Sequence, residues 1–282
     1  MNERELYTIL QYIRDNPLHW AEGIKTRCAE ASSNLRLIVI DIDGCLTPGE
    51  GQPWDFEALK YIAELNRRVR IGASLNGAPT LPAVTLCTGR QEPYVEVLMQ
   101  AIDAHMPGIY ENGGGLYFPR TYRFIENPLI THEVKKALAE VKETLQRGVV
   151  ERGLGYLQPG KEVSCTLHPS GVSLRELHRA VAEVIGADDL PLHAEEAETC
   201  VNVLPLGVDK GTGVRWLSEE TGIPLEEMGG IGDSASDLKF LRLVDLSAAP
   251  ANASAEVKAE VDYVSPYQDG AGVVDILRRW VR

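Results

Sequence analysis

Two acidic residues stand two positions apart where a short apolar run ends. The run extends from Leu35 to Ile40, and Asp41, Asp43 and Gly44 follow it. Side chains two positions apart in a strand lie on the same side, and ligands of open α/β sheets bind where parallel strands end. Two carboxylates this close resist joint ionisation unless a cation or hydrogen-bond donors compensate, and Mg²⁺ is a hard cation that prefers oxygen ligands. The pattern predicts a magnesium site at a strand end.

The alternatives for this motif are an ordinary turn and a calcium-binding loop. Asp followed by Gly is a common turn signal, and it accounts for most isolated matches of this kind. A calcium loop that began at Asp41 would need Gly at its sixth position and Glu at its twelfth, where this chain has Leu46 and Gln52. The calcium loop is therefore excluded, and the turn stays open until the other motifs are considered.

A hydroxyl group follows the next apolar run. Thr88, Gly89 and Arg90 come directly after Ala83 to Cys87. A threonine hydroxyl and the backbone N–H groups at a helix start can hold phosphate oxygens. Taken singly, Thr88 is equally suited to be the N-cap of that helix.

A lysine stands just before another predicted helix, at position 210 in the run Gly207 to Gly211. The ammonium group of Lys210 is a compact positive charge that can serve phosphoryl oxygens and a carboxylate nucleophile. An exposed lysine beside a helix-capping Asp209 is the simpler alternative.

Two more acidic residues, Asp233 and Asp237, follow the run Met228 to Ile231. Ser234 and Asp237 also have the spacing of a capping box, which can coexist with a ligand role because Asp233 precedes it. Four such motifs occur in this order, each after a predicted strand or before a predicted helix. Their order favours one shared site for phosphate and metal.

Short apolar runs that alternate with amphipathic helical stretches predict an α/β fold, with a Rossmann-like core built on a parallel sheet. Residues from about 120 to 204 break this alternation and are typical of a small α+β domain inserted between two core strands, where it could close over the site like a lid. We predict a core domain of residues 35–118 and 206–282, a cap of residues 119–205 and an N-terminal extension of residues 1–34. The predicted strands are 35–40, 83–87, 108–110, 162–167, 199–204 and 228–231; the predicted helices are 58–67, 132–147 and 173–185, and residues 71–82 are a predicted surface loop.

The composition restricts the class of partner. The 282 residues include 28 Lys and Arg against 41 Asp and Glu, and the formal net charge of −13 argues against a nucleic-acid surface and a membrane surface. The sequence has no apolar stretch long enough to span a bilayer and no secretory signal, so we expect a cytoplasmic protein. Its five cysteines are scattered without C-x-x-C spacing, which favours reduced thiols over a zinc site.

The N-terminal extension contains an amphipathic pattern. Leu6, Ile9, Leu10 and Ile13 have helical spacing within residues 3–14. The apolar face of this predicted helix should pack on the main body or on a second copy of the chain, so a homodimer is one of two open arrangements.

Together the four motifs resemble the haloacid dehalogenase superfamily of phosphatases, and the resemblance covers the predicted core. The insertion between the second and third motifs is similar to the α/β cap of the type IIB, or Cof-like, branch. In that superfamily an Asn usually precedes the last motif aspartate, whereas Ser236 stands here. We expect altered hydrogen bonding at this position and retained metal binding.

Within that branch, the runs Glu111 to Gly114 and Ala249 to Ala253 resemble the archaeal phosphoglycolate phosphatases, with mannosyl-3-phosphoglycerate and sucrose-phosphate phosphatases as close relatives. The resemblance implies that Asn112 binds substrate, although Asn112 with Gly113 is also a common hairpin turn.

The resemblance also implies a role for each core residue. Asp41 is the expected nucleophile, and Asp43 is the expected acid that protonates the leaving oxygen and later deprotonates water. The expected phosphate-binding residues are Thr88, Gly89, Arg90 and Lys210, and the expected Mg²⁺ ligands are Asp41, Asp233 and the backbone carbonyl of Asp43, with Asp237 in support.

In the cap, Lys161 lies on a predicted strand similar to the one that faces substrate in relatives, and a solvated pair of Lys161 with Glu162 is the alternative. The expected function is that of a magnesium-dependent phosphohydrolase acting on a small phosphorylated metabolite, either an acid such as phosphoglycolate or a sugar phosphate. A phosphomutase of the same superfamily and a non-catalytic phosphometabolite-binding protein stay open as alternatives.

Overall fold

The computed structural model describes residues 34–76, 81–186 and 190–281, so the helix predicted within residues 3–14 lies outside it. Five parallel strands form a central sheet in the order β12-β11-β10-β1-β2. The strands are β1 (Leu37–Ile40), β2 (Ala83–Leu86), β10 (Met228–Ile231), β11 (Leu246–Ala249) and β12 (Tyr263–Val264). The four residues of β1 are completely buried, as an apolar strand in the middle of a parallel sheet should be. The predicted α/β class is confirmed.

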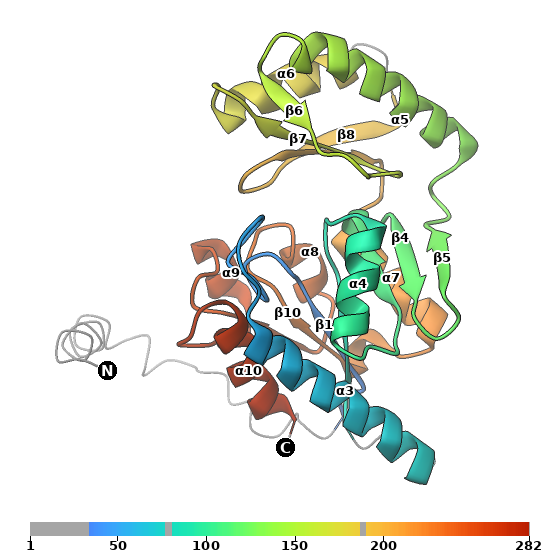
Figure 1. Ribbon diagram of the computed structural model, residues 1–282, viewed down its shortest axis with the longest axis vertical. Coiled ribbons are helices and arrows are strands. Elements are labelled where there is room, and N and C mark those ends of the chain that lie inside the picture. Colours follow the sequence, from blue (N-terminus) through green and yellow to red (C-terminus); the bar gives the residue numbers. More distant parts are fainter. Residues whose placement is uncertain (1–33, 77–80, 187–189, 282) are drawn as a thin grey trace, which may run out of the picture.

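Helices cover this sheet, and α3 and α10 pack against each other (Figure 1). The helices of this part are α3 (Phe56–Asn76), α4 (Glu92–Ala101), α7 (Lys210–Thr221), α8 (Leu238–Leu241), α9 (Ala255–Glu260) and α10 (Asp269–Trp280), with the 3-10 turn η5 (Leu225–Glu227). The predicted loop 71–82 is wrong over residues 71–76, which continue α3. Extending a formed helix costs much less than nucleating one, so Gly72 does not end it. In the described part of the chain, no helix is long and apolar enough to cross a membrane.

A second, antiparallel sheet flanks the first and has the order β3-β4-β5. Its strands are β3 (Gly108–Tyr110), β4 (Gly115–Phe118) and β5 (Arg123–Glu126), and the 3-10 turn η3 (Glu111–Gly113) joins the first two. Strand 108–110 was predicted at the right position, but it pairs with β4 instead of joining the parallel sheet. A single bridge between Cys87 and Ile109 connects the two sheets.

The third sheet forms a separate layer above the core in Figure 1, where helices α5 and α6 cover its outer face. Its order is β6-β7-β9-β8, and all its pairs are antiparallel. The elements are α5 (His132–Leu145), the π-helical turn η4 (Gln146–Val150), β6 (Gly155–Leu157), β7 (Cys165–Pro169), α6 (Leu174–Gly186), β8 (Leu192–Glu196) and β9 (Val201–Pro205). The strand predicted at residues 162–167 is therefore displaced, because residues 162–164 are irregular and β7 begins at Cys165.

The buried apolar side chains form one cluster around the parallel sheet and a smaller one inside the cap layer. Strand β5 pairs with β4, and Ile130 belongs to the core cluster, whereas the cap cluster begins at Val134. We therefore propose that the cap begins near residue 131, later than the predicted residue 119. The other proposed boundaries stay as predicted from the sequence.

A side chain from α3 hydrogen-bonds the outer backbone groups of the edge strand β2. The fully buried Asn66 accepts a hydrogen bond from the N–H of Val84 (2.8 Å) and donates to the carbonyls of Val84 (3.2 Å) and Ile102 (3.0 Å). Its amide thus replaces a neighbouring strand at the sheet edge, where unpaired backbone groups would otherwise be buried.

Replacing Asn66 by Leu keeps the number and branching of the side-chain heavy atoms but leaves three buried backbone groups without partners, so we expect a loss of about 2–4 kcal/mol in the free energy of unfolding. Urea denaturation measures it. The matched control is Arg67→Ala, which removes an exposed neighbour and should change stability by less than about 0.5 kcal/mol. Equal midpoints for the two variants would contradict this role.

Candidate active site

Three adjacent strands of the parallel sheet end at the same edge, and each is followed by a predicted site residue. Asp41 follows β1, Thr88 lies just beyond β2, and Asp233 lies just beyond β10. The N–H of Asp41 donates to the carbonyl of Ile231 (2.9 Å), and the N–H of Cys87 donates to that of Ile40 (2.9 Å), which continues the sheet up to the site. The order β10-β1-β2 therefore brings together residues almost 200 positions apart.

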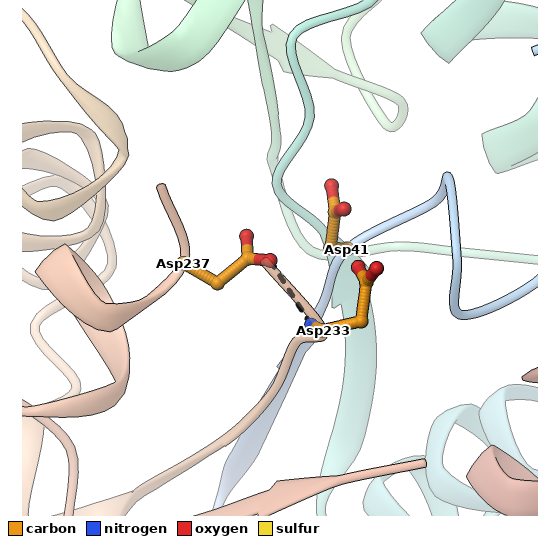
Figure 2. A group of neighbouring side chains, drawn as sticks. All are labelled: Asp41, Asp233 and Asp237. Atoms are coloured by element: carbon orange, nitrogen blue, oxygen red, sulfur yellow. Dashed lines mark hydrogen bonds between the residues drawn. The ribbon is translucent and has the colours of Figure 1, made fainter. Parts of the chain in front are cut away.

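Three carboxylates meet at this edge. One oxygen each from Asp41, Asp233 and Asp237 lies within 4.8 Å of the others, and all three side chains are buried (Figure 2). The ammonium of Lys210 lies 2.9 Å from Oδ1 of Asp41 and 2.7 Å from Oδ1 of Asp237. Because Lys210 is only 5 % exposed, the alternative of a solvated lysine is wrong. The capping role of Asp209 is confirmed, since it forms a capping box with Thr212 at the start of α7.

Asp237 uses both of its oxygens within the protein. Its Oδ2 accepts hydrogen bonds from the N–H of Asp233 (3.1 Å), the N–H of Ser234 (2.9 Å) and the Ser234 hydroxyl (2.9 Å), while Oδ1 accepts from Lys210. The Ser236 hydroxyl lies 2.9 Å from that of Ser234. Asp237 therefore shapes the turn that carries Asp233 and fixes the ammonium. Only half of the capping box considered for Ser234 and Asp237 forms: Asp237 accepts from the N–H of Ser234, whereas the N–H of Asp237 donates to the Ser234 carbonyl instead of its hydroxyl.

The cluster is buried away from water and contains more acidic than basic groups. Burial, with the charge of Asp237 next in importance, raises the pKa of Asp41 to about 7. Burial and the charges of Asp237 and Asp41 raise the pKa of Asp233 to about 9. Burial alone would lower the pKa of Lys210, but the charges of Asp237 and Asp41 outweigh it and hold that pKa well above its ordinary value. A single ammonium does not neutralise three carboxylates, so the donor set fits an additional hard cation such as Mg²⁺.

Gly44 lets the first and last motifs approach each other. Its φ is +84°, and a Cβ atom at this position would lie 2.1 Å from Oδ2 of Asp233. Any other residue would displace the Asp233 carboxylate, which explains why glycine follows the two aspartates. The carbonyl of Gly44 accepts a hydrogen bond from the amide of Asn252 (2.7 Å), which lies in the loop after β11.

Asp43 points away from the carboxylate cluster and toward a guanidinium. Its two oxygens accept hydrogen bonds from Nε (2.8 Å) and Nη2 (2.6 Å) of Arg90, and the side chain is not one of the three clustered carboxylates. Arg90 also lies over the ring of Tyr94, 4.7 Å from its centroid. The structure thus links Arg90 to Asp43, whereas the sequence suggested direct phosphate binding by Arg90.

Thr88 is buried beside the cluster and is not a helix cap. Helix α4 has Gln91 at its N-cap, and the Thr88 hydroxyl accepts a hydrogen bond from the N–H of Arg90 (3.1 Å). Gly89 packs against the amide of Asn112, whose buried Nδ2 has no hydrogen-bond partner among the described residues. A buried donor without a partner at a pocket wall is a place where a ligand oxygen can bind.

The pocket lies between the sheet edge and the cap and has a volume of about 330 Å³. The predicted residues that line it are Asp41, Asp43, Thr88, Gly89, Arg90, Asn112, Lys161, Lys210 and Asp233; Asp237 lies behind them. From the cap come Lys161, which is 7 % exposed and hence not a solvated residue, and Thr166 and Asn202. The ammonium of Lys161 donates to the Thr166 hydroxyl, which donates in turn to Oδ1 of Asn202 (2.6 Å).

Sequence reasoning missed Thr166, Asn202, Asn252 and Glu111. Thr166 and Asn202 are register partners on β7 and β9, so a correct pairing of the cap strands would have placed them together. Asn252 lay within a run that the resemblance had singled out. Glu111, described below, also lay within such a run, Glu111 to Gly114, but the sequence gave it no role.

Comparisons with known proteins agree with this architecture. Residues 180–277 match the model of the haloacid dehalogenase-like hydrolase family. The phosphoglycolate phosphatases of Methanothermobacter thermautotrophicus and Staphylothermus marinus are 26% and 24% identical over 88% and 87% of this chain, and 99% and 97% of their own lengths are covered. Among solved structures, a Thermoplasma acidophilum protein has a TM-score of 0.67 at 22% identity, with 87% of this chain and 98% of that chain covered. For the sucrose-phosphatase of Synechocystis the TM-score is 0.59 at 14% identity, with 88% and 98% covered.

The raised pKa values predict how magnesium and protons compete. Raised carboxyl pKa values favour the folded protein at low pH, and this stabilisation is lost as pH rises from about 4 through 7 to 9, where Asp41 and then Asp233 ionise. On the predicted role of Asp41 and Asp233 as Mg²⁺ ligands, only their ionised forms would bind it, so we expect magnesium to raise the Tm by several degrees at about pH 8.5 and by little at about pH 6.

Thermal melts with magnesium or with chelator at both pH values measure this. The variant Asp233→Asn should lose the magnesium effect. A pH-independent increase in Tm that survives in this variant would place the cation elsewhere.

Proposed function

This chain belongs to the haloacid dehalogenase-like hydrolases as a phosphatase with a type IIB cap, and we propose that it hydrolyses a small phosphorylated acid in a magnesium-dependent reaction through a phosphorylated Asp41. The observation that carries the proposal is the buried group formed by Asp41, Asp233 and Lys210 at the floor of a closed-in pocket. It combines a carboxylate nucleophile, a cation site and a fixed positive charge, which are the requirements of phosphoryl transfer.

In the first step Oδ of Asp41 attacks phosphorus, and the bond from phosphorus to the ester oxygen breaks. Lys210 contacts the nucleophile and offers positive charge to the phosphoryl oxygens, while the Thr88 hydroxyl and the unpartnered amide of Asn112 are donors at the same pocket wall. The leaving oxygen takes a proton from Asp43. Arg90 holds the Asp43 carboxyl at the pocket wall through both of its oxygens, and since this ion pair favours the ionised form, the transfer requires the pair to open and leave one oxygen free.

In the second step Asp43 takes a proton from water, whose oxygen bonds to phosphorus as the bond to Asp41 breaks. Inorganic phosphate is released and Asp43 is again protonated, so the cycle closes. When Mg²⁺ is bound by Asp41, Asp233 and the backbone carbonyl of Asp43, it supplies charge neutralisation for the phosphoryl group. Asp237 acts through its neighbours, because it orients both Lys210 and the turn of Asp233.

The cap supports a small acid as the substrate. Three basic side chains line the pocket, and two of them have carboxylate partners: Arg90 pairs with Asp43, and Lys210 pairs with Asp41 and Asp237. Lys161 makes no ion pair within the described part of the chain, and two of its three N–H donors are not used by Thr166. A buried ammonium of this kind favours an anionic group, such as a carboxylate at the far end of the substrate. The names of the phosphoglycolate phosphatases among the relatives support the same choice.

Replacing Asp41 by Asn removes the nucleophile, and we expect phosphate release to fall by about 10⁴-fold or more. Because burial makes an ionised Asp41 costly, the variant should melt no lower than the wild-type protein without magnesium at about pH 8. Colorimetric assay of inorganic phosphate and a thermal melt check both statements. Activity equal to that of the wild type would refute the proposed mechanism.

Replacing Lys161 by Met preserves the apolar stem and removes the charge. With phosphoglycolate we expect KM to rise by about 10- to 100-fold. Ethyl phosphate is the matched substrate because it lacks only the carboxylate, and its kcat/KM should change by less than about threefold. A sugar phosphate hydrolysed faster than phosphoglycolate by the wild-type protein would instead favour a neutral substrate group at Lys161.

A further inference from the structure

Glu111 is a buried carboxylate that connects the core to the cap. It is 1 % exposed and stands in η3, between the core strands β3 and β4. Its Oε1 accepts a hydrogen bond from the N–H of Glu162 (2.9 Å), and its Oε2 accepts from the N–H of Val163 (3.1 Å) and from the Ser164 hydroxyl (2.6 Å). No cation lies within ion-pair distance of Glu111 in the described part of the chain, so these three donors from one cap loop compensate its charge.

The backbone of the same turn is hydrogen-bonded to residues 88–90, which are called the phosphate-binding loop because Thr88 and Gly89 are proposed to bind phosphate. The N–H of Glu111 donates to the carbonyl of Arg90 (2.9 Å), and the N–H of Asn112 donates to the carbonyl of Thr88 (2.9 Å). Both turn residues have positive φ values, +47° and +55°, which is uncommon for residues other than glycine. Such strained backbone persists where surrounding contacts determine it, and it concentrates at functional sites.

Apolar packing holds the cap loop in the same place. Val163 is 1 % exposed and belongs to the core cluster, although it lies between two cap strands. Gly114 makes room for it, because a Cβ atom at that position would lie 2.5 Å from Cγ2 of Val163. The loop of residues 161–164 is therefore docked on the core by hydrogen bonds and by burial.

Lys161 is the first residue of this docked loop. Its carbonyl accepts a hydrogen bond from the ammonium of Lys142 on α5 (2.7 Å), and its own ammonium is directed to Thr166. Burial lowers the pKa of Lys161, and the negative charge of Glu111 acts in the opposite direction. The carboxylate therefore favours the charged ammonium while it fixes the backbone that carries it.

We propose that Glu111 is a positioning residue that docks the cap loop of residues 161–164 against the phosphate-binding loop and so sets Lys161 over the substrate. The inference rests on the proposed function, because Lys161 is taken there as the group that binds the far end of the substrate. Glu111 itself touches no reacting atom. It makes the distance between the phosphoryl site and the cap ammonium a fixed property of the folded chain, which selects for substrate length.

The test combines Glu111→Gln with Lys161→Met in a double-mutant cycle. Glutamine keeps the size of the side chain but replaces one acceptor oxygen by a donor that faces N–H or O–H groups of the cap loop. With phosphoglycolate we expect Glu111→Gln to lower kcat/KM by about 10-fold or more, mainly through KM. In the Lys161→Met background the same change should cost less than about threefold, because the residue through which Glu111 acts is already gone.

Hydrogen exchange gives a readout that does not depend on activity. The amides of Glu162 and Val163 donate to Glu111, so a peptide containing them should exchange at least about 10-fold faster in Glu111→Gln, while peptides of α6 stay unchanged. Glu92→Gln is the matched control, since Glu92 is a nearby half-buried carboxylate whose charge acts on Glu111 and Glu162 but which forms no hydrogen bond with the loop in the described part of the chain. It should leave both the exchange rate and kcat/KM as in the wild type.

Two results would overturn the inference. One is an equal loss of kcat/KM from Glu111→Gln in both backgrounds, which a general destabilisation would produce. The other is unchanged exchange of the loop peptide in that variant. If the wild-type protein released phosphate from neither phosphoglycolate nor ethyl phosphate, the proposed function would fail, while the exchange measurement would still confirm or refute the docking of the loop by Glu111.

Discussion

Three carboxylates and one ammonium are buried together at the carboxyl edge of the parallel sheet. This arrangement is electrostatically unfavourable, and the rest of the fold holds it in place. Asp41, Asp233 and Asp237 would separate if their backbones allowed it, since burial and mutual repulsion both oppose ionisation. Lys210 compensates part of this negative charge, and the proposed Mg²⁺ would compensate the remainder. Because burial and repulsion make it costly to ionise these carboxylates, a cation that binds them would relieve that cost.

Holding such a group together requires a stiff frame. The strands that carry the aspartates, β1 and β10, are central in the sheet and buried, and the Asn66 amide hydrogen-bonds the outer edge of β2, the strand next to β1. Asp237 connects the sheet to the site. One of its oxygens fixes the turn that carries Asp233, and the other fixes the ammonium of Lys210. A side chain that satisfies two backbone N–H groups and a lysine at once leaves few alternative positions for any of them, so the geometry is set before a substrate enters.

The sequence was sufficient for the part of the site that strand ends provide. Asp41, Thr88 and Asp233 each follow a short apolar run, and parallel strands place such positions at one edge whatever the loops do. Side-chain pairing was not predictable in the same way. The bond between Asp43 and Arg90 spans 47 positions, and the three-residue strand β3 gave no sign that it would pair with β4. The length of α3 was underestimated because local glycine signals were weighed without the helix that precedes them.

The cap was the least predictable part, and the reason is physical. Apolar periodicity indicates which face of a helix or strand is buried, but it does not indicate which partner buries it. Val163 lies between two cap strands in the sequence and yet packs in the core cluster, and Glu111 has an ordinary acidic side chain whose importance comes only from the loop docked on it. A chemistry shared by many substrates can therefore be predicted from strand ends, whereas the choice among substrates depends on contacts between two separately folded layers. On the proposed mechanism, changes in the loop of residues 161–164 shift Lys161, and with it the choice of substrate, while the phosphoryl site stays the same.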